Sequence, residues 1–394
     1  MNFSGWNDIN LWVDNIASGE EKIGVGIRPY GLHAGNLTAL VAYPYLLCEQ
    51  FKKREKKEPR FDFDIWLNDI EPVSYVGADG RRKSADAANM YAGETTFQFS
   101  LAPDGFQGSL VDYWQPVIEG VVRGVIGAEF PKVKLEFRRA SELVSTPQFK
   151  QMVHKCLTAP EAVGTIIEKY TRSPIRGAES FVWPLCPDCH APIMNSKLGH
   201  ELLSGQSNMV KGQHEKHHKL NKRIEEVAWA TQFRMLHTVR LSTEQPDLWI
   251  VGLDHFPTNS TYLLEHLTDA FGIMPYQGDF LHAPLLFADG DKKFSKSLGN
   301  ARFITPDTLI KVLRENENQG VDLKDAPVSS DIMVVGADFL PDYMLKNRRE
   351  REGTLLQENS AYEQSDRPKR FASANAKGAI ENEYVAGILG VPHL

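Results

Sequence analysis

The stretch that decides the fold runs from Glu21 to Asn36 and reads EKIGVGIRPYGLHAGN. Its first part, residues 22–27, is short, apolar and partly β-branched, which predicts a buried strand. Pro29 and Gly31 interrupt this pattern, and residues 37–51 continue as an apolar run of helical length. The stretch therefore predicts a strand that turns sharply into a helix.

The start of this helix has the features of a phosphate-binding site. Backbone N–H groups without a partner and the positive end of the helix dipole gather at a helix N-terminus. Gly35 lets a nucleotide approach the backbone closely. His33 and Asn36 are three positions apart, so they face the same side of the first turn. We expect these three residues to contact a nucleotide.

A second stretch, DGDKKFSKSLGN at 289–300, is bounded by glycine, and its central part, KFSKS at 293–297, places two lysines and two hydroxyls on a loop. Lysines on such a loop suit the neutralisation of charge that develops on a transferring phosphate. Either motif alone is weak, because His-x-Gly-Asn occurs by chance and a Lys/Ser loop is usually only solvated. Their occurrence in this order, 260 positions apart from His33 to Lys293, is a strong indication of function.

The two motifs resemble the two signatures of class I aminoacyl-tRNA synthetases, usually written HIGH and KMSKS. The first is HAGN here, and the second has Phe294 in place of Met. The segments between them are most similar to the archaeal-type class I lysyl-tRNA synthetase, and the resemblance covers roughly residues 20 to 300. Four stretches carry it: FDIWLND at 63–69, ASEL at 140–143, PLCPDC at 184–189 and GLDH at 252–255.

The resemblance implies an α/β fold with a Rossmann-like, doubly wound parallel sheet, an inserted connective subdomain and a short, mainly helical C-terminal region. The expected units are residues 1–140 and 226–305 for the two halves of the catalytic domain, 141–225 for the insertion and 306–394 for the C-terminal region. Beyond the signature stretch, the patterns predict helices in residues 1–20 and at 113–125, 147–170, 225–237 and 260–271, and strands at 61–67, 133–137, 247–253, 278–287 and 331–335.

The implied reaction is the activation of an amino-acid carboxylate with ATP, accompanied by Mg²⁺, with release of pyrophosphate. Its catalysis would consist of positioning and of stabilising phosphate charge. The resemblance assigns this role to His33, Asn36, Lys293 and Lys296. It assigns nucleotide contacts to Pro29, Gly31, Gly35, Ser295, Ser297, Gly252 and Asp254, and amino-acid contacts to Ile27, Arg28, Asp69, Trp229, Asp254 and His255.

Two of these residues carry open alternatives. Asp69 follows a predicted strand, where ligands bind in a doubly wound sheet, and it either reads a substrate amine or forms an Asx turn. Arg28 stands where the lysine enzymes carry a small residue. A cation there repels a lysine side chain and pairs with a carboxylate, unless it points away into an ion pair. Lysine is thus the substrate by resemblance, and an acidic or modified amino acid competes with it.

Cys186 and Cys189 have the spacing of half a zinc knuckle. The resembling family has a second cysteine pair, whereas no cysteine follows here, so His214 and His217 are the nearest further ligands. A structural zinc site and an empty, decayed site are about equally supported. A redox role is the weakest interpretation, because no thioredoxin-like pattern surrounds the pair.

The composition sets limits on the acceptor. The chain has 394 residues, a net charge of −7 and four cysteines, with no apolar run long enough to span a bilayer and no secretory pattern, so we expect a cytoplasmic protein. Residues 301–394 contain 12 Lys and Arg against 15 Asp and Glu, which argues against tight tRNA binding. A tRNA, a small amine or a carrier therefore remain open as acceptors. An inactive relative that binds amino acid or RNA is a third alternative.

Overall fold

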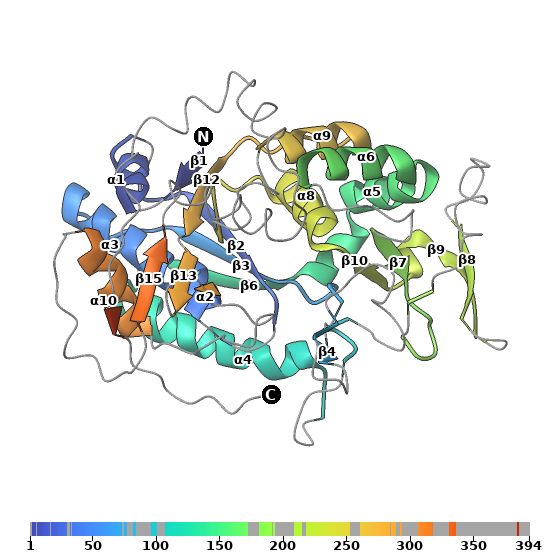
Figure 1. Ribbon diagram of the computed structural model, residues 1–394, viewed down its shortest axis with the longest axis horizontal. Helices are drawn as coiled ribbons and strands as arrows, with labels where there is room; N and C mark the ends of the chain where they lie inside the picture. The colour runs from blue at the N-terminus through green and yellow to red at the C-terminus, as the bar shows by residue number, and fades with distance from the viewer. Residues whose placement is uncertain are drawn as a thin grey trace.

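The computed structural model describes residues 2–4, 6–15, 17–29, 32, 34–72, 75–76, 82–83, 96–100, 107–171, 181–190, 192–193, 209–214, 218–252, 261–283, 285–288, 292–293, 306–317, 331–335 and 384–385. Its centre is a sheet of six parallel strands in the order β6-β3-β2-β11-β12-β1 (Figure 1). These strands are β1 (Asn2–Ser4), β2 (Lys22–Ile27), β3 (Asp62–Leu67), β6 (Lys134–Arg139), β11 (Leu248–Gly252) and β12 (Asp279–Ala283).

The strand order confirms the predicted doubly wound, Rossmann-like sheet. From β2 the chain moves outward through β3 to β6, and it then returns to the other side of β2 to add β11 and β12. The direction of winding therefore reverses between β2 and β11. In open α/β sheets, ligands bind beyond the carboxyl ends of the strands at such a reversal. The signature stretch leaves β2 at this point.

Helices cover both faces of the sheet (Figure 1). Within the described part, no helix is long and apolar enough to cross a membrane. One face is covered by α1 (Trp6–Asn15), α2 (Ala34–Leu37), α3 (Tyr43–Glu55), α4 (Leu110–Val122) and α10 (Pro306–Glu317). The other is covered by α5 (Pro147–Thr158), α6 (Pro160–Thr171), α8 (Phe233–Glu244) and α9 (Thr261–Phe271).

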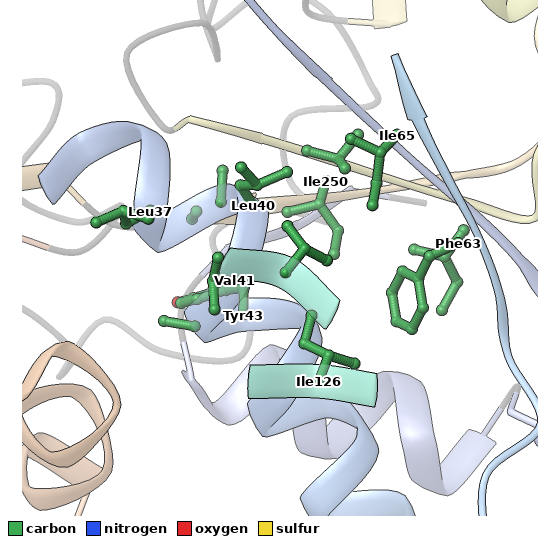
Figure 2. Close-up of a cluster of buried hydrophobic side chains, with 14 of the residues drawn as sticks. Leu37, Leu40, Val41, Tyr43, Phe63, Ile65, Ile126 and Ile250 are labelled. Atoms are coloured by element: carbon green, nitrogen blue, oxygen red, sulfur yellow. The ribbon is translucent and has the colours of Figure 1, made fainter. Parts of the chain in front are cut away.

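The face toward α3 and α4 buries a continuous apolar core. Alternate residues of β2, Ile23, Val25 and Ile27, belong to it, because side chains one position apart in a strand point to opposite faces. Figure 2 shows Leu40 and Val41 of the helical segment in one cluster with Ile65 and Ile250 of the strands.

The helix that follows the signature stretch contains one wide turn. A π-helical turn at Thr38–Ala42 joins α2 to α3, and the N–H of Tyr43 donates to the carbonyl of Thr38. Pro44 accounts for this turn, because proline has no N–H to donate and its ring clashes with the carbonyl four residues earlier in a regular helix. The predicted helix is confirmed, with Pro44 marking its irregular point.

Three predicted elements were wrong in detail. The helix at 147–170 is two helices, α5 and α6, which meet at Ala159. The helix at 225–237 is a 3₁₀ turn (Ile224–Glu226), strand β10 (Trp229–Thr231) and only then α8. The strand at 278–287 is divided between β12 and β13 (Leu285–Ala288).

A second, antiparallel sheet has the order β14-β13-β15-β16. The strand predicted as an isolated piece is β15, and it pairs with β13. The described part of the C-terminal region thus contains α10 and two strands. The bounds are β14 (Lys292–Lys293), β15 (Asp331–Val335) and β16 (Tyr384–Val385). The remaining short elements are β4 (Tyr75–Val76), β5 (Arg82–Lys83), β7 (Val182–Pro184), β8 (Met209–His214), β9 (His218–Arg223), a π turn (Arg123–Gly127) and a 3₁₀ helix (Ala140–Ser145).

Candidate functional site

The first motif lies at the predicted strand-to-helix turn. β2 ends at Ile27, and α2 begins at Ala34 and continues through the π turn into α3. Gly35 is exposed and Asn36 is half-buried in the first helical turn. His33 and Gly31 lie outside the described residues. The described backbone therefore has a strand end followed by a helix start, and a helix N-terminus is where phosphates commonly bind.

The second motif lies on a neighbouring element. β14 carries Lys293, which pairs in register with Phe287 of β13. β13 in turn contacts α2, the helix that begins with the first motif (Figure 1). The elements that carry the two motifs, 260 positions apart in the sequence, thus both contact β13. Ser295, Lys296 and Ser297 fall outside the described part of the chain.

Arg28 forms an ion pair at the carboxyl end of β2. Its Nε donates to Oε2 of Glu71 at 2.6 Å, and Nδ2 of Asn68 donates to the other carboxylate oxygen at 2.6 Å. Glu71 is buried, whereas the Arg28 side chain is 53% exposed. The negative charge of Glu71 raises the pKa of Arg28. The ion pair is one of the two predicted alternatives for Arg28, but it engages only one edge of the guanidinium.

Asp69 joins the carboxyl ends of two strands. Its Oδ1 accepts from the backbone N–H of Ser141 at 2.8 Å, and its Oδ2 accepts from the Ser141 hydroxyl at 2.7 Å. Burial raises the pKa of Asp69 to about 6, although both hydrogen bonds from Ser141 oppose the shift. The carboxylate therefore holds the end of β3 against the 3₁₀ helix after β6. Ser141 does not cap α5, whose cap is Thr146.

Arg240 lies beneath this edge of the sheet, on α8. Its side chain is completely buried, and none of its three guanidinium nitrogens has a hydrogen-bond partner in the described part. Burial lowers the pKa of Arg240 to about 10, against the attraction of Glu71 and Glu244. A buried cation without hydrogen bonds is costly, so Arg240 needs an explanation.

The other predicted contact residues have mixed placements. Ile27 and Pro29 are buried, and Gly252 is half-buried as the last residue of β11. Trp229 is fully buried, and its indole N–H donates to the carbonyl of Ile224 at 3.1 Å, so it packs as a core residue. Asp254 and His255 lie outside the described residues.

The cysteine pair forms a tight turn between Leu185 and Pro192, which are bridged in antiparallel fashion. His190 has a left-handed backbone with φ of 57°, and its N–H donates to the Cys186 carbonyl at 2.9 Å. Cys186 is buried and Cys189 is exposed. Among the described residues, these side chains do not converge on a group of three metal ligands, and His217 lies outside that part of the chain.

Sequence reasoning missed three residues of this region: Glu71, Ser141 and Arg240. Glu71 lies two positions after Asp69, and its proximity to a strand end was the available signal. Arg240 gave no signal, because an arginine on an amphipathic helix is ordinarily solvent-exposed.

Neither a family model nor a curated protein matches this sequence. Among solved structures, the chain is similar to tyrosyl-tRNA synthetase from Archaeoglobus fulgidus, solved in complex with L-tyrosine, with 14% sequence identity and a TM-score of 0.37. The match covers 76% of this chain and 65% of that one. The chain thus spans less than two thirds of the length of that synthetase.

Proposed function

We propose that this protein activates the carboxylate of an amino acid with ATP, forms an aminoacyl-adenylate and releases pyrophosphate. The observation that carries the proposal is the contact between β13 and α2, because it brings the strand before the lysine loop to the helix that begins with HAGN. A triphosphate needs cations on one side and N–H donors on the other. The lysines that follow β13 and the start of α2 are suited to supply them.

In this reaction a carboxylate oxygen of the amino acid attacks the α-phosphorus of ATP. The bond from that phosphorus to the oxygen bridging to the β-phosphate breaks, and pyrophosphate leaves with its electron pair. ATP fits the start of α2, because Gly35 is exposed there and has no side chain to exclude a nucleotide. His33 and Asn36 hold the phosphates, Lys293 and Lys296 stabilise the leaving pyrophosphate, and Mg²⁺ offsets further phosphate charge.

The test is ATP–pyrophosphate exchange with Lys296→Ala and with Lys292→Ala as the matched control. Removing Lys296 lowers exchange by about 100-fold or more, since one lost charge at the developing phosphate anion is worth about 3 kcal/mol or more. Amino-acid binding changes far less in the same variant. Lys292 is a neighbouring lysine outside the signature, and its loss leaves exchange within about twofold. Unchanged exchange in Lys296→Ala refutes the proposal.

The activated aminoacyl group has two candidate acceptors, a tRNA and a small amine or carrier. The resemblance favours tRNA and a lysyl-tRNA synthetase-like ligase. The excess of acidic residues in 301–394 favours a small amine or a carrier, because most affinity for tRNA comes from phosphate contacts. Filter binding with bulk tRNA, in the presence and absence of ATP and amino acid, separates the two. Retention of tRNA that depends on salt supports the first acceptor, and its absence supports the second.

We further propose that the cysteine turn holds a structural zinc ion with help from β8 and β9. In favour of this, the backbone at His190 is left-handed, which turns the chain sharply after the second cysteine. β8 packs against the turn, because a side chain added at Gly212 would lie 2.8 Å from Ile193. Gly212 is two positions before His214, so the backbone of β8 brings this histidine close to the turn. Metal analysis of wild type and of Cys186→Ser/Cys189→Ser tests it, and equal zinc content in both contradicts it.

A further inference from the structure

The buried arginine on α8 sits directly under the functional edge of β2. A side chain built at Gly26 would place its first carbon 2.3 Å from Nη1 of Arg240, so the guanidinium occupies the space that glycine leaves. Its Cζ lies 5.0 Å from the ring centre of Trp249 and 5.8 Å from that of Trp66. The arginine is therefore held beneath the second-last residue of β2 by two aromatic rings rather than by hydrogen bonds.

The carboxylate one turn further along α8 does not balance this charge. Oε2 of Glu244 accepts from Nη1 of Arg138 at 2.6 Å and from Nζ of Lys22 at 3.0 Å. Lys22 also pairs with Asp64 at 2.9 Å. Nε of Arg138 also donates to Oε2 of Glu142 at 3.3 Å, so this cluster contains two cations and three carboxylates, and the third carboxylate is on a half-exposed side chain.

The carboxylate on the other side is shared. Glu71 already pairs with Arg28, and its second oxygen accepts from Asn68. Asp69, the other acid at this strand end, is bound by both donors of Ser141. Glu71 is thus paired with Arg28 and also attracts Arg240, while Asp69 is a second carboxylate at this strand end and is turned to Ser141. The exposed charge of the group is that of Arg28.

Arg28 presents this charge to solvent. Only its Nε hydrogen-bonds within the described part of the chain, and half of its side chain is exposed at the carboxyl end of β2. The opposite edge of a guanidinium carries two parallel N–H groups, which match the two oxygens of a carboxylate. Glu71 fixes the orientation of this edge, and the buried charge of Arg240 attracts the same carboxylate.

We propose that the amino acid activated at this site carries a carboxylate side chain, which the outer edge of Arg28 binds, and that Arg240 is a positioning residue for this contact. The proposal rests on the function proposed above. A lysine side chain would instead meet the cation of Arg28, whose partner Glu71 is buried and already paired. The same edge would also suit a phosphate of ATP, so the experiment distinguishes the two anions.

The first arm measures ATP–pyrophosphate exchange with aspartate, glutamate and lysine. Wild type is expected to prefer an acidic amino acid. Arg28→Gln keeps a hydrogen-bond donor but loses the charge, and it lowers kcat/KM for the acidic substrate by about 10- to 100-fold, the value of a charge-assisted hydrogen bond. The KM for ATP stays within about twofold in the same variant, because the nucleotide lies at α2 in this proposal. A change confined to the KM for ATP would assign the anion to the nucleotide and overturn the inference.

The second arm compares Arg240→Met with Arg240→Lys. Because the buried charge has no hydrogen bonds, Met is expected to raise the melting temperature while it lowers the preference for acidic over cationic substrates by about tenfold. Lys retains the charge and restores most of the preference. If Met lowers the melting temperature and leaves the preference unchanged, Arg240 has a structural role only and the positioning claim fails.

The outcomes separate the two proposals. If none of the amino acids supports ATP–pyrophosphate exchange, the proposed function itself is refuted. Exchange that is faster with lysine than with aspartate and glutamate would leave that function standing and refute only the acidic specificity.

Discussion

The two faces of the central sheet differ in the side chains that they bury. Toward α3 and α4, the strands present aliphatic and aromatic side chains that form one apolar core. Toward α8, the strand β2 presents Lys22, Gly24 and Gly26, which lie against charged groups and tryptophans. The first face supplies stability through burial of apolar area. The second face gives up some stability to hold charge close to the edge where the signature stretch leaves β2.

The difference between the two faces indicates on which side of the sheet binding is expected. An apolar face is satisfied by any well-packed set of side chains, and it binds nothing. A face that buries a cation without hydrogen bonds in the described part keeps its charge close to the strand ends, at a cost in stability. Two arginines on the same face show the contrast. The Cζ atoms of Arg138 and Arg240 lie 4.2 and 5.8 Å from the ring centre of Trp66, but within the described residues only Arg138 forms an ion pair.

The largest effect is expected on the apolar face. Ile250 is 1% exposed and packs in the cluster of Figure 2, so Ile250→Ala lowers the free energy of unfolding by about 2–5 kcal/mol through lost burial and a cavity. Urea denaturation measures it. Val117→Ala, at a position 42% exposed on α4, changes the same quantity by less than about 1 kcal/mol. Equal losses in both variants would contradict the assignment of this face as the core.

A smaller effect is expected at the glycines of the other face. A side chain added at Gly24 would lie 2.2 Å from the ring of Trp249, whereas one at Gly26 would meet the end of a flexible arginine. Gly24→Ala therefore costs about 1–3 kcal/mol, and Gly26→Ala costs less because the guanidinium can shift. Thermal unfolding of the two variants ranks them. The reverse ranking would show that Arg240 is held more rigidly than its lack of hydrogen bonds suggests.

Removing the ion-paired arginine is expected to cost less again. Arg138→Met breaks the bond to Glu244 and lowers the free energy of unfolding by about 1–2 kcal/mol, since a hydrogen bond to a charged group is lost. The exposed pair of Arg60 and Glu20 is the control, and Arg60→Met changes stability by less than about 0.5 kcal/mol. If Arg138→Met stabilises the protein as Arg240→Met is expected to, then pairing does not distinguish the two arginines.

The smallest effect at fixed pH is expected at Asp69. Its pKa is raised to about 6, so the folded state binds a proton more tightly than the unfolded chain does. Stability contributed by this proton is present below about pH 4 and is lost as the pH rises through about 6. Asp69→Asn resembles the protonated acid, so at pH 4 it changes stability by less than about 1 kcal/mol.

Urea denaturation from pH 4 to pH 7 tests this prediction, because Asp69→Asn removes the decline. Asp112 provides the opposite case, since hydrogen bonds from Ser109 lower its pKa. Asp112→Asn should therefore change stability more at neutral than at acidic pH. The same pH profile for wild type and Asp69→Asn would contradict the assigned proton.

The sequence predicted the elements that local patterns determine. The strands β2, β3, β6 and β11 are apolar runs bounded by breakers, and they were placed within two residues of their bounds. The division of LHAPLLF between two sheets was missed, although Pro284 interrupts it, because sheet membership depends on distant partners. Trp229 was expected near the substrate pocket, but pairing of β10 with β7 places it in the core.

The candidate site was predictable only in part, for the same reason. The backbone course around Gly35 and Asn36 follows from a strand, a breaker and a helix in succession. The partners of Arg28 and Asp69 lie 43 and 72 positions away, so no local pattern names them. The charge of Arg240 acts at the same edge only after α8 has packed beneath β2.

The wide turn at Thr38–Ala42 has a consequence for how the first motif is aimed. One surplus residue in a helix rotates everything before it by about 100° relative to everything after it. The direction in which Gly35 and Asn36 point is therefore set separately from the face that α3 buries, so the first motif and the core do not have to share one helical register. Pro44→Ala restores an N–H donor, so the π turn can become a regular α-helical turn. Gly35 and Asn36 would then be rotated relative to α3, while the residues of α3 stay in the core.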